Sequence, residues 1–329
     1  MIRVENLTKA FGPKLAVNDV SFRVERGEVL GFLGPNGAGK STTMRMITGF
    51  IPPSEGKVSV GGFDMLHHPI PAKRLIGYLP ENAPAYVDMS VRSFLSFCAE
   101  LSGLRGDERK QAVNRVVEMC FLESVLYQSV DTLSKGFRHR TCLAQAIIHD
   151  PDILVLDEPT DGLDPNQKHE IRSLIRRMGE RKAIIFSTHI LEEVESACTR
   201  AIIIDRGRIV ASGTPQELKS RSELSGAVLF AVRGANGAQL TERFAALPVA
   251  RKAVVVKQAD GEVWVRVYPR DGGSETRNGE LIRSVLAAAN SWQIEEVRSE
   301  EGRLDEVFRS ITLPETAKPS APSAANGHA

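Results

Sequence analysis

The sequence lacks a long apolar run. No stretch approaches the ~20 consecutive apolar residues that a membrane-spanning helix requires, and the start of the chain has no basic segment followed by an apolar one, as a signal peptide would. With 42% hydrophobic and 25% charged residues, the composition is that of a globular protein with a sizeable core. If the protein serves a membrane, another chain must supply the channel.

Cysteine is scarce, and an excess of one charge is absent. The cysteines Cys98, Cys120, Cys142 and Cys198 are widely spaced and form no C-x-x-C pair, so neither a zinc site nor a disulfide framework is indicated. We expect buried, reduced thiols in a cytosolic protein. The formal net charge is +1, which gives no sign of a nucleic-acid partner, and we expect none.

One glycine-rich stretch near the start fits the phosphate-binding pattern G-x-x-x-x-G-K-[ST] without a gap. A short apolar run, 29–33, predicts a buried strand before it, and 42–48 predicts a helix after it. Backbone N–H groups and the helix N-terminus would then hold a phosphate chain. The predicted nucleotide-binding residues here are Gly34, Pro35, Asn36, Gly37, Ala38, Gly39, Lys40, Ser41 and Thr42.

The rest of the first two thirds reads as an α/β unit. Alternating positions in 2–30 predict half-buried antiparallel strands, and apolar runs at 153–157 and 183–188 predict buried strands. From about 90 to 148 the pattern becomes helical, with Ser90 and Asp107 as expected helix caps. A hairpin is expected to turn at Arg206-Gly207. Strands alternating with helices favour a largely parallel sheet.

Further motifs follow in a fixed order: Tyr78-Leu79-Pro80-Glu81, Leu133-Ser134-Lys135-Gly136-Phe137, Asp157-Glu158, Gly162-Leu163-Asp164 and Ser187-Thr188-His189. Together with the glycine-rich loop (Walker A), this set resembles the ATP-binding cassette ATPases of ABC transporters over residues 1 to about 220. The resemblance implies an α/β P-loop NTPase cassette: a mixed sheet with an antiparallel β-subdomain and a helical subdomain at about 90–148. ATP and Mg²⁺ are the implied cofactors.

Phosphoryl transfer to water needs a metal, an aligned water molecule and charge stabilisation at the γ-phosphate. We expect Lys40 to reach the β- and γ-phosphates and Glu158 to act as general base. Beside the other motifs, His189 is expected to contact the γ-phosphate and orient the water; taken alone, it reads as a satisfied core histidine. The expected metal ligands are Ser41, Asp157 and Glu81.

Phe11 has two interpretations. It is either a packed aromatic or, as the resemblance favours, a ring that stacks on the nucleotide base.

Two departures from the family pattern concern Glu81 and the signature loop. Most members have glutamine at the position of Glu81, although a carboxylate can also coordinate a hard cation. The usual signature is Leu-Ser-Gly-Gly-Gln, whereas Lys135 and Phe137 stand here in place of glycine and glutamine. Lys135 could add a cation near the phosphates or point into solvent, and the sequence leaves both open.

The resemblance also implies partners. In this family the signature loop caps the nucleotide of a second cassette, so Ser134, Gly136 and Asp164 would act across a dimer of two copies, or of this chain and a paralogous ATPase. Within the family, the chain resembles the ATPase subunits of ABC-2 type exporters, and most of all those of the gliding-motility and copper-export branches. Such subunits pair with a separate membrane permease. We expect this permease to dock around Glu81 and 89–91, and the chain to be cytoplasmic and peripheral to the inner face of the cell membrane.

Past residue 220 the motifs stop. Strands and helices in the order βαββαβ predict a small α+β ferredoxin-like domain at 225–312, followed by a disordered tail at 313–329. This domain could sense a ligand, aid dimerisation or cover the cassette.

Two other functions remain open from the sequence: a soluble ABC ATPase without a permease, and an ATP-binding regulatory module with little hydrolysis.

Overall fold

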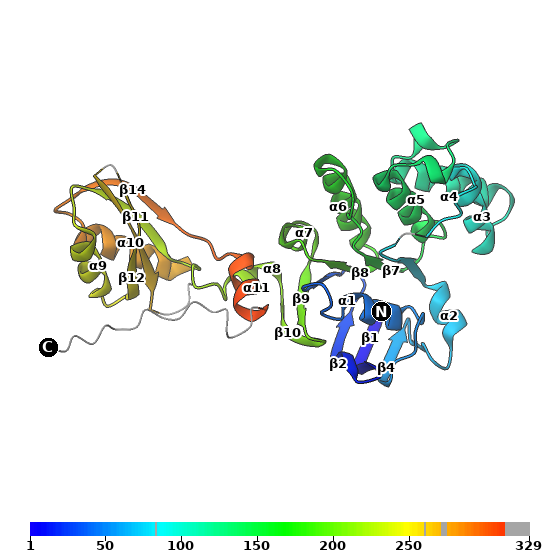
Figure 1. Cartoon of the computed structure of the whole chain (residues 1–329), viewed down its shortest axis with the longest axis horizontal. Coiled ribbons are helices and arrows are strands. Elements are labelled where there is room, and N and C mark those ends of the chain that lie inside the picture. The colour runs from blue at the N-terminus through cyan, green and yellow to red at the C-terminus, as the bar shows by residue number, and fades with distance from the viewer. Residues whose placement is uncertain (83, 260, 271–274, 313–329) are drawn as a thin grey trace. The chain divides into compact units, whose positions relative to one another are not determined.

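The computed structural model divides into two units, Met1–Pro215 and Gln216–Ala329 (Figure 1). A six-stranded sheet runs through the first unit. The structure describes residues 1–82, 84–259, 261–270 and 275–312, so the predicted tail lies outside the described residues. The division between units falls slightly before the limit of 220 expected from the sequence.

The strands of this sheet stand in the order β10-β9-β3-β8-β7-β6, parallel except for the β9–β10 pair. The expected hairpin connects β9 to β10 through a two-residue turn at Arg206 and Gly207. Both residues have positive φ, as such a tight turn requires. The strand bounds are β3 (Val29–Leu33), β6 (Ile76–Leu79), β7 (Ile153–Asp157), β8 (Ala183–Thr188), β9 (Arg200–Asp205) and β10 (Arg208–Gly213).

The central strands β3, β7 and β8 are buried along their whole length because both faces of the sheet are covered. Since successive side chains point to opposite faces, Leu30 and Val155 join one core cluster, whereas Leu154 and Phe186 join another. The first cluster contains α1 (Lys40–Ile47); the second contains α6 (Pro165–Gly179).

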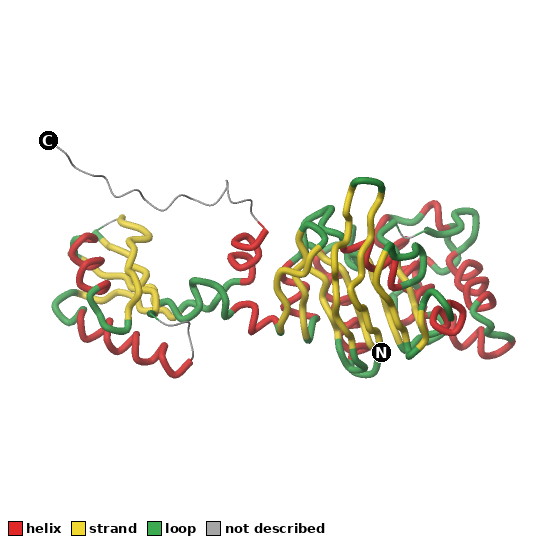
Figure 2. Tube along the Cα trace, turned by 90° about the horizontal axis from the view of Figure 1, so that it is seen from below, coloured by secondary structure: helices red, strands yellow, loops and turns green. Residues whose placement is uncertain are grey.

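A four-stranded antiparallel sheet covers the α1 side. Its strand order is β2-β1-β4-β5, and Figure 2 shows strands of this unit side by side in yellow. Ile2, Val4 and Val58 from this sheet share one core cluster with Met44 and Ile47 of α1. The bounds are β1 (Ile2–Phe11), β2 (Lys14–Val24), β4 (Glu55–Val60) and β5 (Phe63–Asp64), with α2 (Pro69–Arg74) following.

The predicted helical segment contains α3 (Val91–Leu101), α4 (Gly106–Met119) and α5 (Lys135–Ile147). Ser90 caps α3 as expected, since its Oγ accepts a hydrogen bond from Ser93 N at 3.2 Å. The expectation for Asp107 is wrong. The extended residue before α4 is Arg105, so Asp107 lies inside the first turn, where its charge still complements the helix dipole.

The second unit is an antiparallel sheet in the order β12-β13-β11-β14, which is the strand order of the predicted ferredoxin-like fold. Its core is built around Phe230 and Phe244, whose rings meet edge to face at 5.6 Å. The bounds are α8 (Pro215–Lys219), β11 (Val228–Arg233), α9 (Gly237–Ala245), β12 (Ala250–Ala259), β13 (Glu262–Pro269), α10 (Glu275–Ala288), β14 (Gln293–Ser299) and α11 (Leu304–Thr312).

Candidate functional site: a phosphate loop beside a carboxylate–histidine pair

The glycine-rich loop joins the end of β3 to the start of α1, in the strand–loop–helix context that the motif requires. Gly39 stands directly before α1 with φ 108°, and a Cβ there would lie 2.6 Å from Ala16 O, so only glycine fits. The loop therefore presents backbone N–H groups and a helix N-terminus at one point.

Lys40 is only 6% exposed although it carries a charge. Its Nζ donates to the carbonyl oxygens of Gly34 (2.8 Å) and Pro35 (3.3 Å), and it lies 3.8 Å from Glu158 Oε1. The ammonium group is thus held inside the concave side of the loop rather than in solvent.

Asp157 ends β7 and is fully buried. Its Oδ1 accepts hydrogen bonds from Ser41 Oγ at 3.2 Å and from Ser187 Oγ, whereas its Oδ2 has no partner among the described residues. A buried carboxylate oxygen without a partner is costly. This oxygen and the Ser41 hydroxyl are suitable ligands for Mg²⁺. The ion prefers oxygen ligands and usually binds only one or two protein carboxylates, keeping several water molecules.

Glu158 follows directly, with φ 52°, a left-handed conformation that is uncommon for residues other than glycine. Ser187 Oγ accepts a hydrogen bond from Glu158 N at 3.0 Å, which helps to hold this backbone. The side chain is 13% exposed, and its Oε2 lies 2.9 Å from His189 Nδ1. One carboxylate therefore contacts Lys40 on one side and His189 on the other.

Burial raises the pKa of the Glu158 carboxyl above its ordinary value, whereas the nearby His189 and Lys40 oppose this by favouring the charged form. A carboxyl with a raised pKa is a stronger proton acceptor when ionised. The arrangement can therefore deprotonate a water molecule placed next to a phosphate in the loop.

A pocket of about 620 Å³ opens beside these groups. Phe11 lines it and is 51% exposed, so it is not a packed core aromatic. Glu81, at the end of the β6 segment, lines the same pocket together with Glu158. The other lining residues are Lys14, Ala16, Asn36, Gly37, Gly39, Lys40, Ser41 and Thr42.

Comparison with known proteins identifies the family of the chain. A family model described as "ABC transporter" matches residues 17–161. The "Linearmycin resistance ATP-binding protein LnrL" of Bacillus subtilis (strain 168) is 32% identical over 315 residues, which are 95% of this chain and 98% of that protein. The chain belongs to the ABC transporter ATP-binding proteins. It is an ATPase subunit that binds and hydrolyses ATP to energise transport.

Other ABC proteins match about two thirds of the chain. "Nod factor export ATP-binding protein I" of Burkholderia lata is 39% identical over 66% of this chain and 72% of that protein. "Probable multidrug ABC transporter ATP-binding protein YbhF" of Escherichia coli (strain K12) is 39% identical over 68% of this chain but only 38% of its own length. A solved structure of an ATP-binding subunit of an ABC transporter superposes with a TM-score of 0.62 at 30% identity, over 67% of this chain and 92% of that one.

The remaining predicted site residues of this ABC cassette lie at the starts of helices. Ser134, Gly136 and Asp164 are not among the residues that line the pocket. Within the described chain, Ser134 caps α5 by accepting from Phe137 N, and Asp164 caps α6 by accepting from Gln167 N. Among the described residues, Ser134 of the ABC signature loop therefore caps its own helix and does not line the nucleotide pocket.

The Lys135 side chain is 68% exposed, which agrees with the solvent-facing alternative from the sequence, and it also pairs with a carboxylate. Its Nζ donates to Asp161 Oδ2 at 2.8 Å, and its carbon stem runs so close to Gly162 that a Cβ there would meet it at 2.6 Å. Lys135 therefore joins the signature loop to the turn after Glu158. The Phe137 ring packs under the Arg140 guanidinium, 4.4 Å from its centroid.

Three hydroxyl side chains of this ABC site were not singled out from the sequence: Ser187, Thr188 and Thr160. Ser187 and Thr188 belong to the Ser187-Thr188-His189 motif, where only the histidine was given a role. Their position at the tip of a fully buried strand was the available signal, because buried hydroxyls need partners.

None of the helices that the structure describes has the length and apolar character of a bilayer-spanning segment.

Proposed function

We propose that this chain hydrolyses ATP as one half of a two-copy nucleotide sandwich and thereby drives a separate membrane permease. In each site, one copy would supply Phe11, the loop 34–42, Glu81, Asp157, Glu158 and His189, and the other copy would supply Ser134, Gly136 and Asp164. The observation that carries the proposal is the Glu158 carboxylate, which lies 3.8 Å from Lys40 Nζ and 2.9 Å from His189 Nδ1.

The catalytic roles follow from that geometry. Lys40 would neutralise charge on the β- and γ-phosphates, and Glu158 would take a proton from the attacking water. His189 is 54% exposed, so its free ring nitrogen can reach a phosphate at the mouth of the site while Nδ1 stays with Glu158. Phe11, exposed at the pocket rim, offers a flat face to the nucleotide base.

Ser41, Asp157 and Glu81 would hold Mg²⁺, which supplies charge neutralisation at the phosphates when it is bound. The free Oδ2 of Asp157 and the Ser41 hydroxyl support this assignment. Glu81 lines the same pocket from the β6 side, where a carboxylate can reach the metal directly or through water.

The two-copy arrangement is supported by the position of the signature-loop residues Ser134 and Gly136, which do not line the nucleotide pocket of their own chain. A second chain would therefore bring these residues to the γ-phosphate. ATP would then favour the closed dimer, because only that state touches both ends of the nucleotide.

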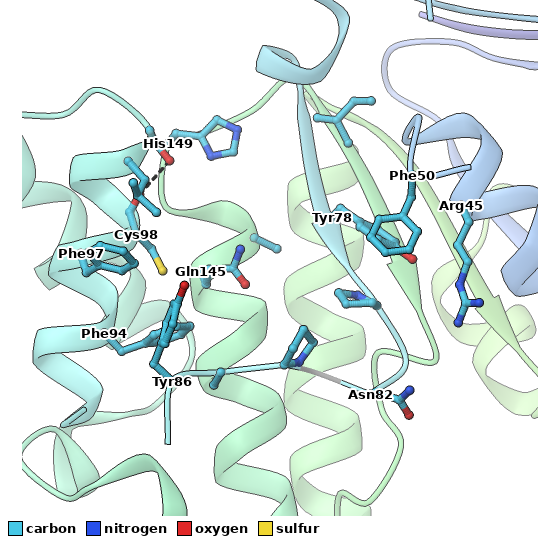
Figure 3. A pocket seen from close by; sticks show the side chains of 17 residues that line it. Arg45, Phe50, Tyr78, Asn82, Tyr86, Phe94, Phe97, Cys98, Gln145 and His149 are labelled. Carbon is cyan, nitrogen blue, oxygen red and sulfur yellow. Dashed lines mark hydrogen bonds between the residues drawn. The ribbon is translucent and has the colours of Figure 1, made fainter. Parts of the chain in front are cut away.

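A groove of about 890 Å³ is the proposed permease site (Figure 3). Aromatic side chains dominate it: the Tyr86 ring stands edge-on to Phe97 at 5.5 Å and lies 6.4 Å from Phe94, and Phe50 and Leu101 are exposed at its rim. Such a surface suits a short amphipathic segment between the spans of a permease, whose apolar side would cover the rings.

One stretch of chain connects the groove to the nucleotide pocket. Tyr78 of β6 lines the groove, and Glu81, two residues after the end of β6, lines the pocket. The short segment 78–81 would therefore transmit the presence or absence of nucleotide in the pocket to a permease bound in the groove. The surface expected from the sequence, Glu81 and 89–91, neighbours the groove residues Asn82 and Phe94 in the chain but does not itself line the groove. A permease bound in the groove would keep the chain at the cytoplasmic face of the membrane.

The two-copy site is tested with the Glu158→Gln variant, in which bound ATP persists. Sedimentation velocity should show a monomer without nucleotide and a dimer at saturating MgATP. ADP, which lacks the γ-phosphate, is the control and should leave the monomer. A chain that stays monomeric with MgATP contradicts the proposal.

The groove is tested with charges at its rim. Because Phe50 and Leu101 are exposed, Phe50→Asp and Leu101→Asp should leave the ATPase rate of the isolated protein unchanged within about twofold, but they should abolish copurification with the permease. Leu66→Asp, at an exposed leucine outside the groove, is the matched control and should retain copurification. If Phe50→Asp and Leu101→Asp retain copurification, the interface lies elsewhere.

A further inference from the structure

A buried carboxylate lies beside the catalytic pair without touching it. Glu193, in α7 (Leu191–Ala197), is 1% exposed. Its Oε1 accepts a hydrogen bond from Thr160 Oγ1, and its Oε2 accepts one from Thr188 Oγ1 at 2.6 Å. Burying a carboxylate costs free energy unless its oxygens are satisfied, and here both oxygens are satisfied by hydroxyl groups.

The two threonines belong to the two segments that carry the proposed catalytic residues. Thr188 is the last residue of β8 and directly precedes His189; its Oγ1 also accepts from Ile190 N at 3.0 Å. Thr160 follows Glu158 by two positions, in a turn where Asp161 N donates to Glu158 O at 3.0 Å. Glu193 therefore holds the chain on both sides of the Glu158–His189 contact.

The His189 ring needs such a support. With a side chain 54% exposed, it has little packing to fix its place, so its position depends on the backbone before and after it. That backbone is fixed at Thr188 by Glu193 and at Ile190 by the Thr188 hydroxyl.

We propose that Glu193 is a positioning residue for ATP hydrolysis: it bridges the segment after Glu158 to the segment before His189 and so sets the distance between these two side chains. The inference rests on the proposed roles of Glu158 and His189. Glu193 is not among the described residues that line the nucleotide pocket, and it acts through the two threonines.

The first test compares Glu193→Ala with Glu193→Gln. Because misplacing a catalytic group by about 1 Å can cost roughly 10²-fold, Glu193→Ala should lower kcat by about 10- to 100-fold with the KM for ATP changed less than about threefold. Glutamine keeps the shape and can still pair with both hydroxyls, so Glu193→Gln should recover kcat to within about fivefold of the parent. Glu192→Ala, at the neighbouring exposed glutamate that pairs with Arg172, is the matched control and should keep the parent rate.

The second test is a double-mutant cycle with His189→Ala. If Glu193 acts through His189, adding Glu193→Ala to His189→Ala should lower kcat no further. A further loss of the full single-variant size would overturn the inference, as would a folded Glu193→Ala protein with the parent kcat. If His189→Ala itself retains the parent kcat, the proposed catalytic role of His189 fails instead, so the two failures are distinguishable.

Should Glu193→Ala fail to fold, the isosteric variants Thr188→Val and Thr160→Val carry the same test. Each removes one hydroxyl that Glu193 holds, and each should lower kcat with little change in KM. A parent kcat in both threonine variants would overturn the inference.

Discussion

Glu158→Gln is expected to lower the turnover number for ATP by roughly 10²- to 10⁴-fold, the range that general base catalysis contributes. An amide of the same shape cannot accept a proton from water. It can still hold the hydrogen bond with His189, and glutamine tolerates the φ of 52° no worse than glutamate does. ATP affinity should therefore remain within about threefold of the parent value, since binding is carried by the loop.

Phosphate release under steady-state conditions measures the turnover number, and equilibrium titration with a fluorescent ATP analogue measures affinity. Glu180→Gln, at an exposed glutamate that ends α6, is the matched control and should change neither quantity. Turnover at more than about a third of the parent rate would mean that another group takes the proton.

The nucleotide loop could be predicted because its chemistry is local. The loop, the preceding strand and the following helix are contiguous, so pattern and structure coincide at Gly39 and Lys40. The contact between Glu158 and His189 was less direct: it needs two neighbouring parallel strands, β7 and β8, whose carboxyl ends lie at one edge. The two apolar runs predicted the strands, but the role of His189 beside Glu158 came from the resemblance to the ABC cassette motifs, because His189 taken alone reads as a core histidine.

Glu193 could not be predicted, because the sequence gives no reason to choose between it and Glu192. Both stand in the first turn of α7, where acids are favoured by the helix dipole. Only the fold turns one glutamate toward Thr160 and Thr188 and leaves the other in solvent with Arg172. Adjacent identical residues acquire different roles from tertiary packing alone.

Lys135 illustrates the same limit for charge. Its partner, Asp161, lies on another segment, and the lysine fits against a glycine that offers no side chain to exclude it. The groove follows likewise from distant positions, since Phe50, Tyr86 and Phe94 come from separate parts of the chain (Figure 3). No one of these aromatic residues, taken alone, indicates a groove in the sequence.

Lys40→Ala is expected to act on affinity where Glu158→Gln acts on turnover. The Lys40 ammonium is 6% exposed and already faces the concave side of the loop, so little rearrangement separates it from a bound phosphate. Hydrogen bonds to charged groups contribute about 1.5–3 kcal/mol. Because about 1.4 kcal/mol corresponds to tenfold in affinity, the variant should bind ATP roughly 10- to 150-fold more weakly.

The matched control is Lys14→Ala. Lys14 carries the same charge and lines the same pocket, but it is exposed, so water screens its attraction for the phosphates. Its loss should weaken ATP binding by less than about threefold. Equal losses in the two variants would mean that the overall positive charge of the pocket, rather than a buried ammonium aimed at the phosphates, governs binding. A much larger loss for Lys40→Ala would assign the affinity to burial, because the two residues differ in exposure and not in charge.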